Sequence, residues 1–422
     1  MKPATKHAQR GGASLIVVMV MLFAMALVVA YANRSLLFEQ RSSINQYHAT
    51  QAFEAAEAGL EWAQARLNDP RHLDAQCAPA ASGTSLRQRW LQFDGTLVRH
   101  VPITWSHGGV ATAVHAACAR TPGGWSCHCP SGGHPVLPAA TAAAASVAFI
   151  VHAEAVDRAG IVRVLATGCT GVAGPCDPGG ANAAEATMTV QALFGLMPGI
   201  VSLPTAPLSV HGDVDAGTAA IGWHNPHVAA GGVAVHAGGR VLASNARVTS
   251  APGASHALAV VRQDTALAAL DGDHLFASLF GLDKASWAAQ PAVRRVVCGG
   301  DCGAALSAAI EDSAGPALLF VDEPLTLGGP LMLGTPERPV AIVASGAAGF
   351  SGTLELHGVL YAADIQWHGA APGTALVRGA LISEAGYSGD AAPDLFFDAP
   401  ALRTLQRDSG SFVRLPGSWR DF

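Results

Sequence analysis

The stretch LIVVMVMLFAMALVVAY, residues 15–31, is an unbroken apolar run near the start of this 422-residue chain. No charged residue lies between Gly11 and Asn33, and no proline interrupts the run. A helix needs roughly 17–25 apolar residues to cross the core of a bilayer. In lipid, a single spanning segment satisfies its backbone groups only as a helix. The run therefore predicts a transmembrane helix.

The helical pattern continues well beyond the apolar run. Small and apolar residues recur at steps of three and four, which places them on one stripe of a helix. Because the residue before a proline avoids the helical region, Asn68-Asp69-Pro70 is expected to end the helix. We predict one helix over residues 13–68, apolar in its first half and amphipathic in its second. The stripe consists of Ala49, Ala52, Phe53, Ala56, Leu60, Ala63 and Leu67.

A short basic leader precedes the helix. It carries Lys2, Lys6, His7 and Arg10 and no acidic residue, which predicts a cytoplasmic N-terminus by the positive-inside rule. It ends at Gly12, directly before the apolar run. A secretory signal peptide instead places its cleavage site after the apolar run. A simple signal anchor is the competing interpretation of the apolar run alone.

From Gln9 to Leu67 the chain resembles the N-terminal region of PilX-type minor pilins of type IV pili, most specifically in the segment QAFEAAE at residues 51–57. The resemblance implies cleavage after Gly12 by a prepilin peptidase and methylation of the new terminus at Ala13. It also implies that the helix packs among other pilin helices. The helix-packing candidates are Val17, Phe53, Ala56, Leu60 and Leu67.

Val17 departs from the general pilin pattern, in which the fifth mature position is a glutamate that meets the terminal ammonium of the next subunit. PilX-type subunits and the K-class pseudopilins of type II secretion share this departure. A buried ammonium needs a counter-charge. A subunit with valine here cannot supply one to a subunit above it, which predicts a position at the filament tip.

The pattern of helical and β-forming segments predicts an α+β protein. The length of the chain predicts several domains, because single cores rarely exceed about 250–300 residues. The net charge of −6 offers no basic surface suited to nucleic acid. The expected divisions are a leader (1–12), the pilin helix (13–68, transmembrane over 15–31), an α+β pilin-like domain (69–200), a β-rich solenoid-like domain (201–395) with a helical insertion (264–313), and a C-terminal tail (396–422).

The pilin-like domain should contain a small antiparallel sheet. Alternating apolar patterns predict strands, and residues 157–160 predict the turn of a hairpin. The stretch between Cys118 and Ala145 is rich in glycine, proline and alanine and is interpreted as a loop. Residues 197–207 are interpreted as a linker. The predicted strands are 97–105, 146–155, 160–167 and 186–196.

Short β-forming runs separated by glycine, asparagine, aspartate or proline fill residues 208–389, which favours a β-solenoid. No strict period is visible, so a two-sheet sandwich remains the alternative. Helical spacing over 267–282 and 304–310 predicts the insertion. In the tail, Phe412, Trp419 and Phe422 are expected to pack back on the β-rich domain.

An even number of cysteines beyond a membrane span indicates disulfides. The short-loop pairs Cys169–Cys176 and Cys298–Cys302 are the first candidates, and Cys77 is expected to reach the Cys127/Cys129 pair. A zinc site at Cys127-His128-Cys129 with Cys118 and His134 is the alternative, although one-residue spacing is unusual for zinc. The eight cysteines are Cys77, Cys118, Cys127, Cys129, Cys169, Cys176, Cys298 and Cys302.

The sequence predicts no enzyme, no cofactor and no metal site. It lacks the serine-nucleophile, zinc-helix and phosphate-loop motifs. Two aspartate pairs could bind calcium or act as acid and base, but such pairs more often sit in turns. Four histidines lie in or beside β runs, where a structural role is the default. The residues are Asp213/Asp215, Asp271/Asp273, His211, His236, His357 and His368.

The resemblance implies a minor pilin with roles in pilus biogenesis, twitching motility and adhesion. Its expected partners are other minor pilins, the major pilin, a tip adhesin and the prepilin peptidase. The chain should reside in the inner membrane as a single-pass protein with periplasmic domains, and on the surface after assembly. The alternatives are a K-class-like pseudopilin and a membrane-anchored solenoid that binds or cleaves carbohydrate.

Overall fold

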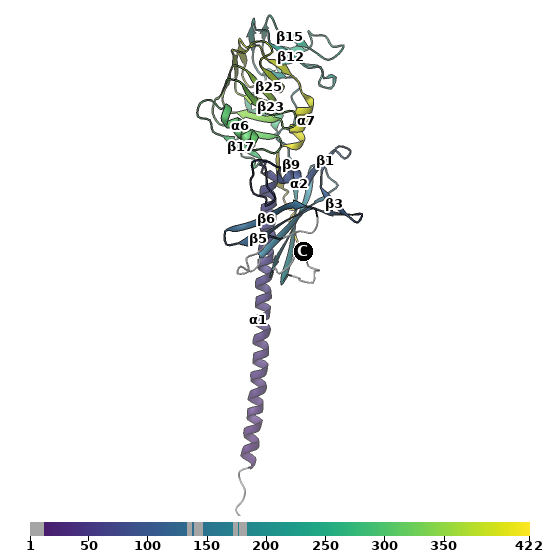
Figure 1. The fold of residues 1–422 in the computed structure, drawn as a ribbon, viewed down its shortest axis with the longest axis vertical. Helices are drawn as coiled ribbons and strands as arrows, with labels where there is room; N and C mark the ends of the chain where they lie inside the picture. The colour runs from purple at the N-terminus through teal and green to yellow at the C-terminus, as the bar shows by residue number, and fades with distance from the viewer. Residues whose placement is uncertain (1–11, 133–136, 139–146, 172–175, 177–183) are drawn as a thin grey trace, which may run out of the picture.

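The molecule is built around one long N-terminal helix. The structure is a computed structural model that describes residues 12–132, 137–138, 147–171, 176 and 184–422. Helix α1, Gly12–Asn68, is a single rod whose lower half projects alone, while all other elements gather around and above its upper end (Figure 1). It ends at Asn68, as the sequence predicts. Leader residues 1–11 lie outside the described residues.

The upper half of α1 packs on one face of a seven-stranded antiparallel sheet. Leu60 of the helix is buried against Phe149 of the sheet. Gly168 permits the close approach of helix and sheet, because a Cβ atom there would lie 1.9 Å from the Ala52 carbonyl oxygen. The strands are β5 His115–Thr121, β6 Gly124–Ser131, β7 Val147–Ala155, β8 Ile161–Thr170, β9 Ala186–Met197, β28 Ser411–Arg414 and β29 Arg420–Asp421, in the order β28-β9-β8-β7-β5-β6 with β29 also paired to β9.

The strands predicted at 146–155, 160–167 and 186–196 are confirmed as β7, β8 and β9, and β7–β8 is an antiparallel hairpin. The loop predicted between Cys118 and Ala145 is wrong in its first part, which forms the β5–β6 hairpin. The Pro-Gly turn at 122–123 closes this hairpin, and cross-strand pairing overrides the weak β propensity of its small residues. Residues 133–136 and 139–146 of that stretch lie outside the described residues.

Short elements pack beside α1 and the sheet: α2 contacts α1 and β6, and β2 contacts β7 and β8. Helix α2, Leu86–Trp90, begins with a capping box in which Ser85 and Gln88 exchange side-chain and backbone hydrogen bonds. The strand predicted over 97–105 is split at Ile103 into two pieces that belong to different hairpins. The hairpins are β1 Leu91–Asp94 with β2 Arg99–Pro102, and β3 Thr104–His107 with β4 Val110–Ala113.

The β-rich domain is a parallel β-solenoid. Every strand pairing within residues 201–396, all of which the structure describes, is parallel. The alternative of a two-sheet sandwich is therefore wrong, and the predicted solenoid is confirmed. Each coil contributes strands to three faces in turn.

The first face contains β10 Leu208–Val210, β13 Val235–Ala237, β16 Val260–Val261, β17 Val293–Val296, β18 Ala317–Val321 and β21 Val340–Ala344. The second face contains β11 Val214–Gly217, β14 Val241–Ala243, β19 Leu325–Gly328, β22 Ala348–Ser351, β24 Ile365–His368 and β26 Tyr387–Gly389. The third face contains β12 Gly222–His224, β15 Arg247–Thr249, β20 Leu331–Leu333 and β27 Asp394–Phe396.

Strands β23, Leu354–Ala362, and β25, Leu376–Ser383, join the third face to the first across a corner. Gly358 and Gly379 stack at this corner with φ of 137° and 141°. A Cβ atom on Gly379 would lie 1.8 Å from the Gly358 carbonyl oxygen. Only glycine fits this corner, because both the conformation and the backbone approach exclude a side chain.

The coils are not stacked in sequence order. The coil of β10, β11 and β12 lies in the middle, with β13–β15 on one side and β25–β27 on the other. Stacked residues are 27 positions apart at Gly217 and Ser244, 24 apart at Leu327 and Ser351 and 22 apart at Asp364 and Gly386. This unequal spacing explains why the sequence shows no strict period.

Helices cover the first face and one end of the solenoid. Helices α4 and α5 and the C-terminal α7 bury Phe276, Trp287 and Leu402 against the outer side chains of the first face. The predicted helical insertion is confirmed in part, because VRRV at 293–296 forms β17 and extends the solenoid sheet beside β18. The helices are α3 Thr265–Ala268, α4 Gly272–Phe280, α5 Lys284–Ala288, α6 Gly303–Glu311, α7 Ala399–Asp408 and the 3-10 turn Val228–Ala230.

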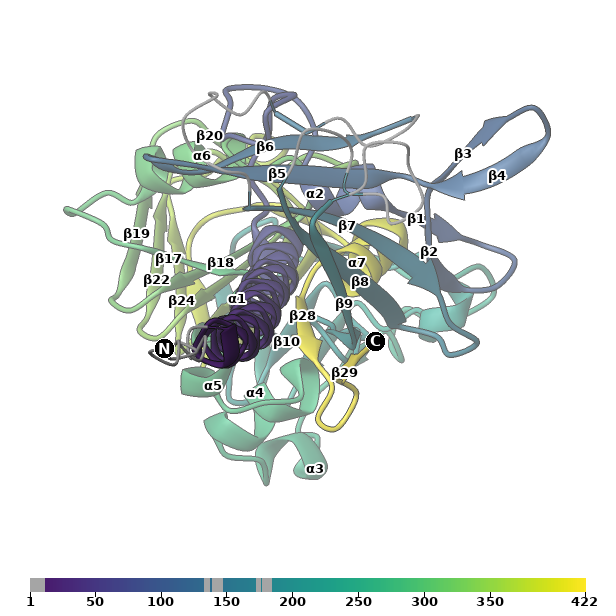
Figure 2. The same cartoon turned by 90° about the horizontal axis from the view of Figure 1, so that it is seen from below.

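The expected packing of the whole tail on the β-rich domain is wrong. Phe412 belongs to the core under α1, and Trp419 contacts Phe53 of α1 with ring centroids 6.2 Å apart. Strand β28 pairs with β9, so that Ser411 lies opposite Met197. Figure 2 shows β28 and β29 in yellow beside the end-on view of α1. Without a neighbour, the edge of β9 would leave its main-chain N–H and C=O groups unpaired. The strands of the tail pair with this edge. The solenoid is thus an insertion between two neighbouring strands of the first sheet.

Candidate assembly and presentation surfaces

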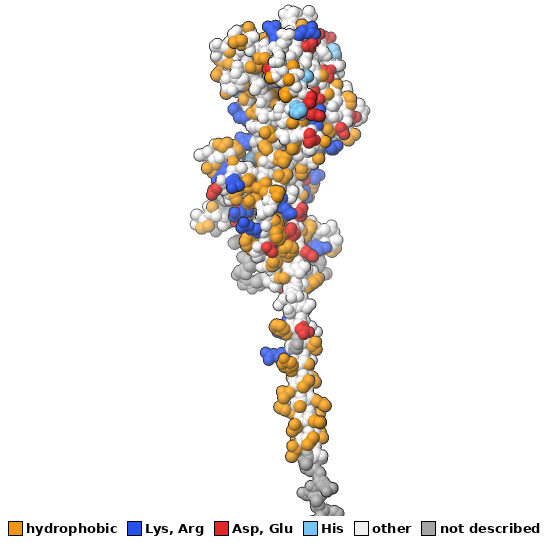
Figure 3. Space-filling model, turned by 180° about the vertical axis from the view of Figure 1, so that it is seen from behind, with side chains coloured by type: hydrophobic (Ala, Val, Ile, Leu, Met, Phe, Trp, Pro, Cys, Tyr) orange, Lys and Arg blue, Asp and Glu red, His pale blue; other side chains and the backbone are white. Residues whose placement is uncertain are grey.

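The lower half of α1 has no protein around it. From Leu15 to Tyr31 its large apolar side chains are 56–79% exposed, and Figure 3 shows them as an apolar rod. The helix is long and apolar enough to cross a membrane. Val17 lies on this rod and is 56% exposed. Such a surface is stable only in lipid or against other apolar helices.

The other predicted helix-packing residues face the protein's own sheet. Ala56, Leu60 and Leu67 are at most 1% exposed and belong to the core under the helix. Phe53 is partly buried beside Trp419. The stripe read from the sequence therefore anchors the globular part to α1, and the surface left for neighbouring helices is the lower rod.

The expected cleavage and methylation site lies at the lower end of that rod. Gly12 is the first residue of α1, so Ala13 lies within the helix. The leader residues 1–11 that precede it lie outside the described residues.

Four disulfides staple the outer domains. Cys77–Cys129 ties the segment after α1 to β6, and Cys118–Cys127 links β5 to β6. The two short-loop bonds are Cys169–Cys176 and Cys298–Cys302. A zinc site built from the thiolates at 118, 127 and 129 is wrong, because each sulfur is already bonded. His134 of that alternative lies outside the described residues.

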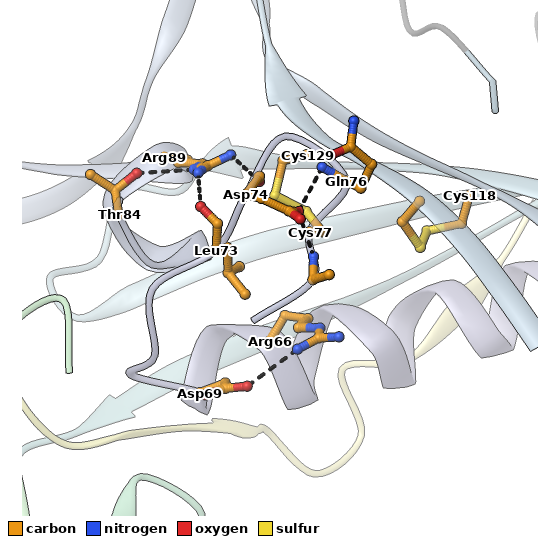
Figure 4. Close-up of a disulfide and its surroundings, with 12 residues drawn as sticks. Arg66, Asp69, Leu73, Asp74, Gln76, Cys77, Thr84, Arg89, Cys118 and Cys129 are labelled. Carbon is orange, nitrogen blue, oxygen red and sulfur yellow. Dashed lines mark hydrogen bonds and ion pairs between the residues drawn. A yellow bond between two sulfur atoms is a disulfide. The ribbon is translucent and has the colours of Figure 1, made fainter. Parts of the chain in front are cut away.

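Hydrogen bonds order the chain around the first of these disulfides (Figure 4). The Asp74 carboxylate accepts from the main-chain N–H groups of Gln76 and Ala78 at 2.8 and 2.9 Å. The Arg89 guanidinium donates to the carbonyl of Asp74 at 2.8 Å and to the carbonyl of Leu73. The loop after α1 is thus held both covalently and by charge-assisted bonds.

Asn68, the last residue of α1, joins the helix to the returning tail. Its Nδ2 donates to the Phe412 carbonyl at 2.9 Å, and its Oδ1 accepts from the Phe412 N–H at 2.7 Å. The two residues are 3% and 1% exposed. The amide therefore satisfies both main-chain groups of one β28 residue away from water.

Arg87, on α2, contributes to the same contact region between the end of α1 and the returning tail, which we call the joint. Its guanidinium donates to the carbonyls of Leu67, Asp408 and Gly410 at 3.3, 3.0 and 2.6 Å. It also lies over the Phe412 ring, 4.9 Å from the centroid. Burial lowers the pKa of Arg87 to about 10, only partly offset by the charge of Asp408. At neutral pH the guanidinium therefore stays charged, and it links the end of α1 to the main chain at Asp408 and Gly410.

Acidic residues complete the joint. Burial acts to raise the pKa of Asp408, but hydrogen bonds and charges from Arg407 and His100 outweigh it and lower this pKa. The same balance, with Arg71 as the main partner, lowers the pKa of Asp69. The solenoid side adds a backbone bond from the Ala314 N–H to the Pro70 carbonyl at 2.8 Å. The His100–Asp408 contact and this backbone bond fix the solenoid to the pilin-like domain.

Residues 10–61 match the model of the PilX N-terminal family. The chain carries a PilX-type pilin N-terminus. This match covers the apolar rod and most of the stripe that binds the sheet, and it ends before the joint.

Comparison with solved structures adds a similarity to the competence-associated pilin ComZ from Thermus thermophilus, with 12% identity and a TM-score of 0.24, over 89% of this chain and 97% of that chain. At these values the similarity carries no argument about this chain. No curated protein sequence matches the chain.

In the two candidate acidic pairs, Asp213 and Asp271 have structural partners. The Asp213 carboxylate bonds the Arg240 guanidinium at 2.7 Å, and this hydrogen bond lowers the pKa of Asp213. Asp271 caps α4 by accepting from the His274 N–H, and Asp273 lies in the first turn of that helix. Within the described residues no group of three or more His, Cys, Asp or Glu side chains could hold a metal ion.

Three of the candidate histidines likewise pair with carboxylates of the solenoid. The contacts are His236–Asp264 at 2.7 Å, His357–Glu355 at 3.0 Å and His368–Asp390 at 3.0 Å. The sequence did not indicate Asn68 or Arg87 as joint residues, because their long-range partners Phe412 and Asp408 lie more than 300 positions away.

Proposed function

We propose that this chain is a minor pilin of a type IV pilus. The observation that carries the proposal is the continuity of α1, whose apolar lower rod begins at Gly12 and whose upper half is the spine of a globular sheet domain. Held in the inner membrane, with its outer domains in the periplasm, the rod would leave lipid and pack against neighbouring helices, replacing lipid contacts by helix contacts. No catalytic step is part of this function.

The processing that we propose follows from the family. A prepilin peptidase would remove residues 1–12, and Ala13 would become the methylated terminus. Other minor pilins and the major pilin would contact the rod formed by Leu15 to Tyr31. The partly exposed Phe53 would lie where the rod meets the first globular domain.

We also propose a position at the filament tip. Val17 offers no carboxylate to a subunit above, where a buried ammonium would need one. The inserted solenoid lies beyond the upper end of α1, on the continuation of the helix (Figure 1). Both features favour a subunit with nothing stacked above it. There the solenoid would be displayed, in contact with a tip adhesin, and would support pilus biogenesis, twitching motility and adhesion.

The experiment that tests the function is deletion of the gene followed by counting surface pili by electron microscopy. The expected result is a loss of pili and of twitching, restored by the full chain. Unchanged pilus numbers and twitching in the deletion strain would contradict the proposal. A K-class-like pseudopilin is the second candidate, favoured by the valine at position 17. It would be supported if the deletion blocked type II secretion while piliation stayed normal.

Restoring the glutamate tests the tip position separately. In the complemented strain, Val17→Glu should leave piliation unimproved, because no subunit above would use the new carboxylate. Val18→Glu is the matched control, since it places the same charge one position along the rod. A clear gain of pili with Val17→Glu alone would contradict the tip assignment.

A further inference from the structure

The distal end of the solenoid is an unfinished coil. On the first face β13 is covered by β16. Among the strands that the structure describes, β14 and β15 on the other two faces each pair on one side only and end their sheets. Figure 1 shows β15 at the end of the molecule farthest from the exposed part of α1. Two strand edges are therefore open at the tip of the molecule.

The apolar core is open at the same two places. Val235, which lies beneath β16, is fully buried. Val241 and Val248 point inward like their stacked neighbours Val214 and Trp223, which are at most 1% exposed, yet both remain only partly buried. The core residue beneath a covering strand is fully buried, whereas the core residues of the two uncovered strands are partly exposed.

The backbone of Val248 faces the open edge. The Arg247 N–H donates to the Ile221 carbonyl at 2.8 Å, and the Thr249 carbonyl accepts from the Asn225 N–H at 2.8 Å. Both bonds point back toward the preceding coil. Because main-chain groups alternate sides along a strand, the N–H and C=O of Val248 point outward, where no further strand of the described residues lies.

Charge distinguishes this end from the rest of the protein. Residues 216–263 contain no aspartate or glutamate, although the chain has a net charge of −6. The same segment carries Arg240, Arg247 and Arg262. The first two pair with aspartates of other coils, and Arg262 is exposed, with no ion pair to a carboxylate of the described residues.

We propose that the open coil is a docking site for an extended segment of a partner protein, which adds as the next parallel strands on β14 and β15. Main-chain hydrogen bonds to Val248 would hold the segment, and apolar side chains at alternate positions would cover Val241 and Val248. Acidic side chains between them would meet Arg262 and the edge arginines. A nucleic acid fits less well, because it has no backbone for strand pairing and two of the three arginines are already neutralised.

The proposal goes beyond the pilin function and does not rest on it. Its probe is a synthetic peptide with the sequence of residues 208–224, a complete coil of this chain that carries Asp213 and Asp215. Binding of the labelled peptide to the full chain in detergent micelles is measured by fluorescence anisotropy. A peptide with both aspartates replaced by asparagine is the matched charge control.

The decisive variant is Val248→Pro, compared with Val248→Ala. Proline removes only the outward N–H and is tolerated on an edge strand whose N–H faces solvent, whereas alanine keeps it. Equal thermal unfolding midpoints for the two variants establish that both fold. As a second measurement on the wild-type chain, amide hydrogen exchange at residue 248 should slow when the peptide is added.

We expect saturable binding of the acidic peptide, at least tenfold weaker binding to Val248→Pro than to Val248→Ala, and weaker binding of the asparagine peptide. Tenfold corresponds to about 1.4 kcal/mol. Absence of saturable binding with unchanged exchange at residue 248 would overturn the proposal. So would equal binding to both variants combined with full competition by an oligonucleotide, which would indicate a surface for anionic polymers.

Discussion

Replacing Asn68 by alanine should loosen the tail from the helix. The substitution leaves the N–H and C=O of Phe412 without partners, at a residue that is 1% exposed. A buried polar group that loses its hydrogen bond costs about 1–3 kcal/mol. Two such groups give an expected loss of about 2–6 kcal/mol, at the large end of single-residue effects.

The assay is guanidinium denaturation of the full chain in detergent, followed by the fluorescence of the buried tryptophans, with hydrogen exchange of the β28 amides as a local readout. Asn245→Ala is the matched control, because Asn245 is exposed and donates one bond to the Thr218 carbonyl. It should change stability by no more than about 0.5 kcal/mol. The reasoning is refuted if Asn68→Ala and Asn245→Ala have equal effects and β28 exchange is unchanged.

Three further predictions concern packing, disulfides and pH. Gly168→Ala should destabilise the pilin-like domain by more than about 1 kcal/mol, since its Cβ would meet the α1 backbone, while Gly123→Ala, with open space around it, should be neutral in the same denaturation assay. Replacing Cys77 and Cys129 together by serine should cost about 4 kcal/mol, the chain-entropy value for their separation of 52 residues, and an unchanged unfolding midpoint would contradict this. The pKa of Asp408 is lowered in the folded state, so its contribution is present above the unfolded value of about 3.9 and is lost as the pH falls through the folded pKa. When the pH is lowered from 5 to 3, a range that spans the unfolded pKa of about 3.9, the wild type should therefore lose more thermal stability than Asp408→Asn. Equal losses in the two proteins would contradict the proposed role of the Asp408 contacts.

Local patterns were sufficient for several elements. The apolar run and the 3–4 spacing predicted α1 and its end at Asn68, because both depend on neighbouring residues. Alternation predicted β7, β8 and β9 for the same reason. Repeated short β runs with glycine corners predicted the solenoid.

The long-range arrangement could not be predicted in this way. The pairing of Phe412 with Asn68 joins residues 344 positions apart, and no local property of either residue indicates it. The tail therefore looked like part of the domain that precedes it in the chain. The β5–β6 hairpin was missed because small residues and glycine mask its alternation, and the out-of-order stacking of the coils removed the period that would have marked them.

The central claim is that α1 is a processed pilin helix. Its most direct test is intact-mass measurement of the full chain after co-expression with a prepilin peptidase. The account predicts a mass reduced by residues 1–12, with a new terminus at Ala13 that gains a methyl group when the enzyme's methylation activity is present. A chain that keeps residues 1–12 under conditions in which a known prepilin is cleaved would contradict the account.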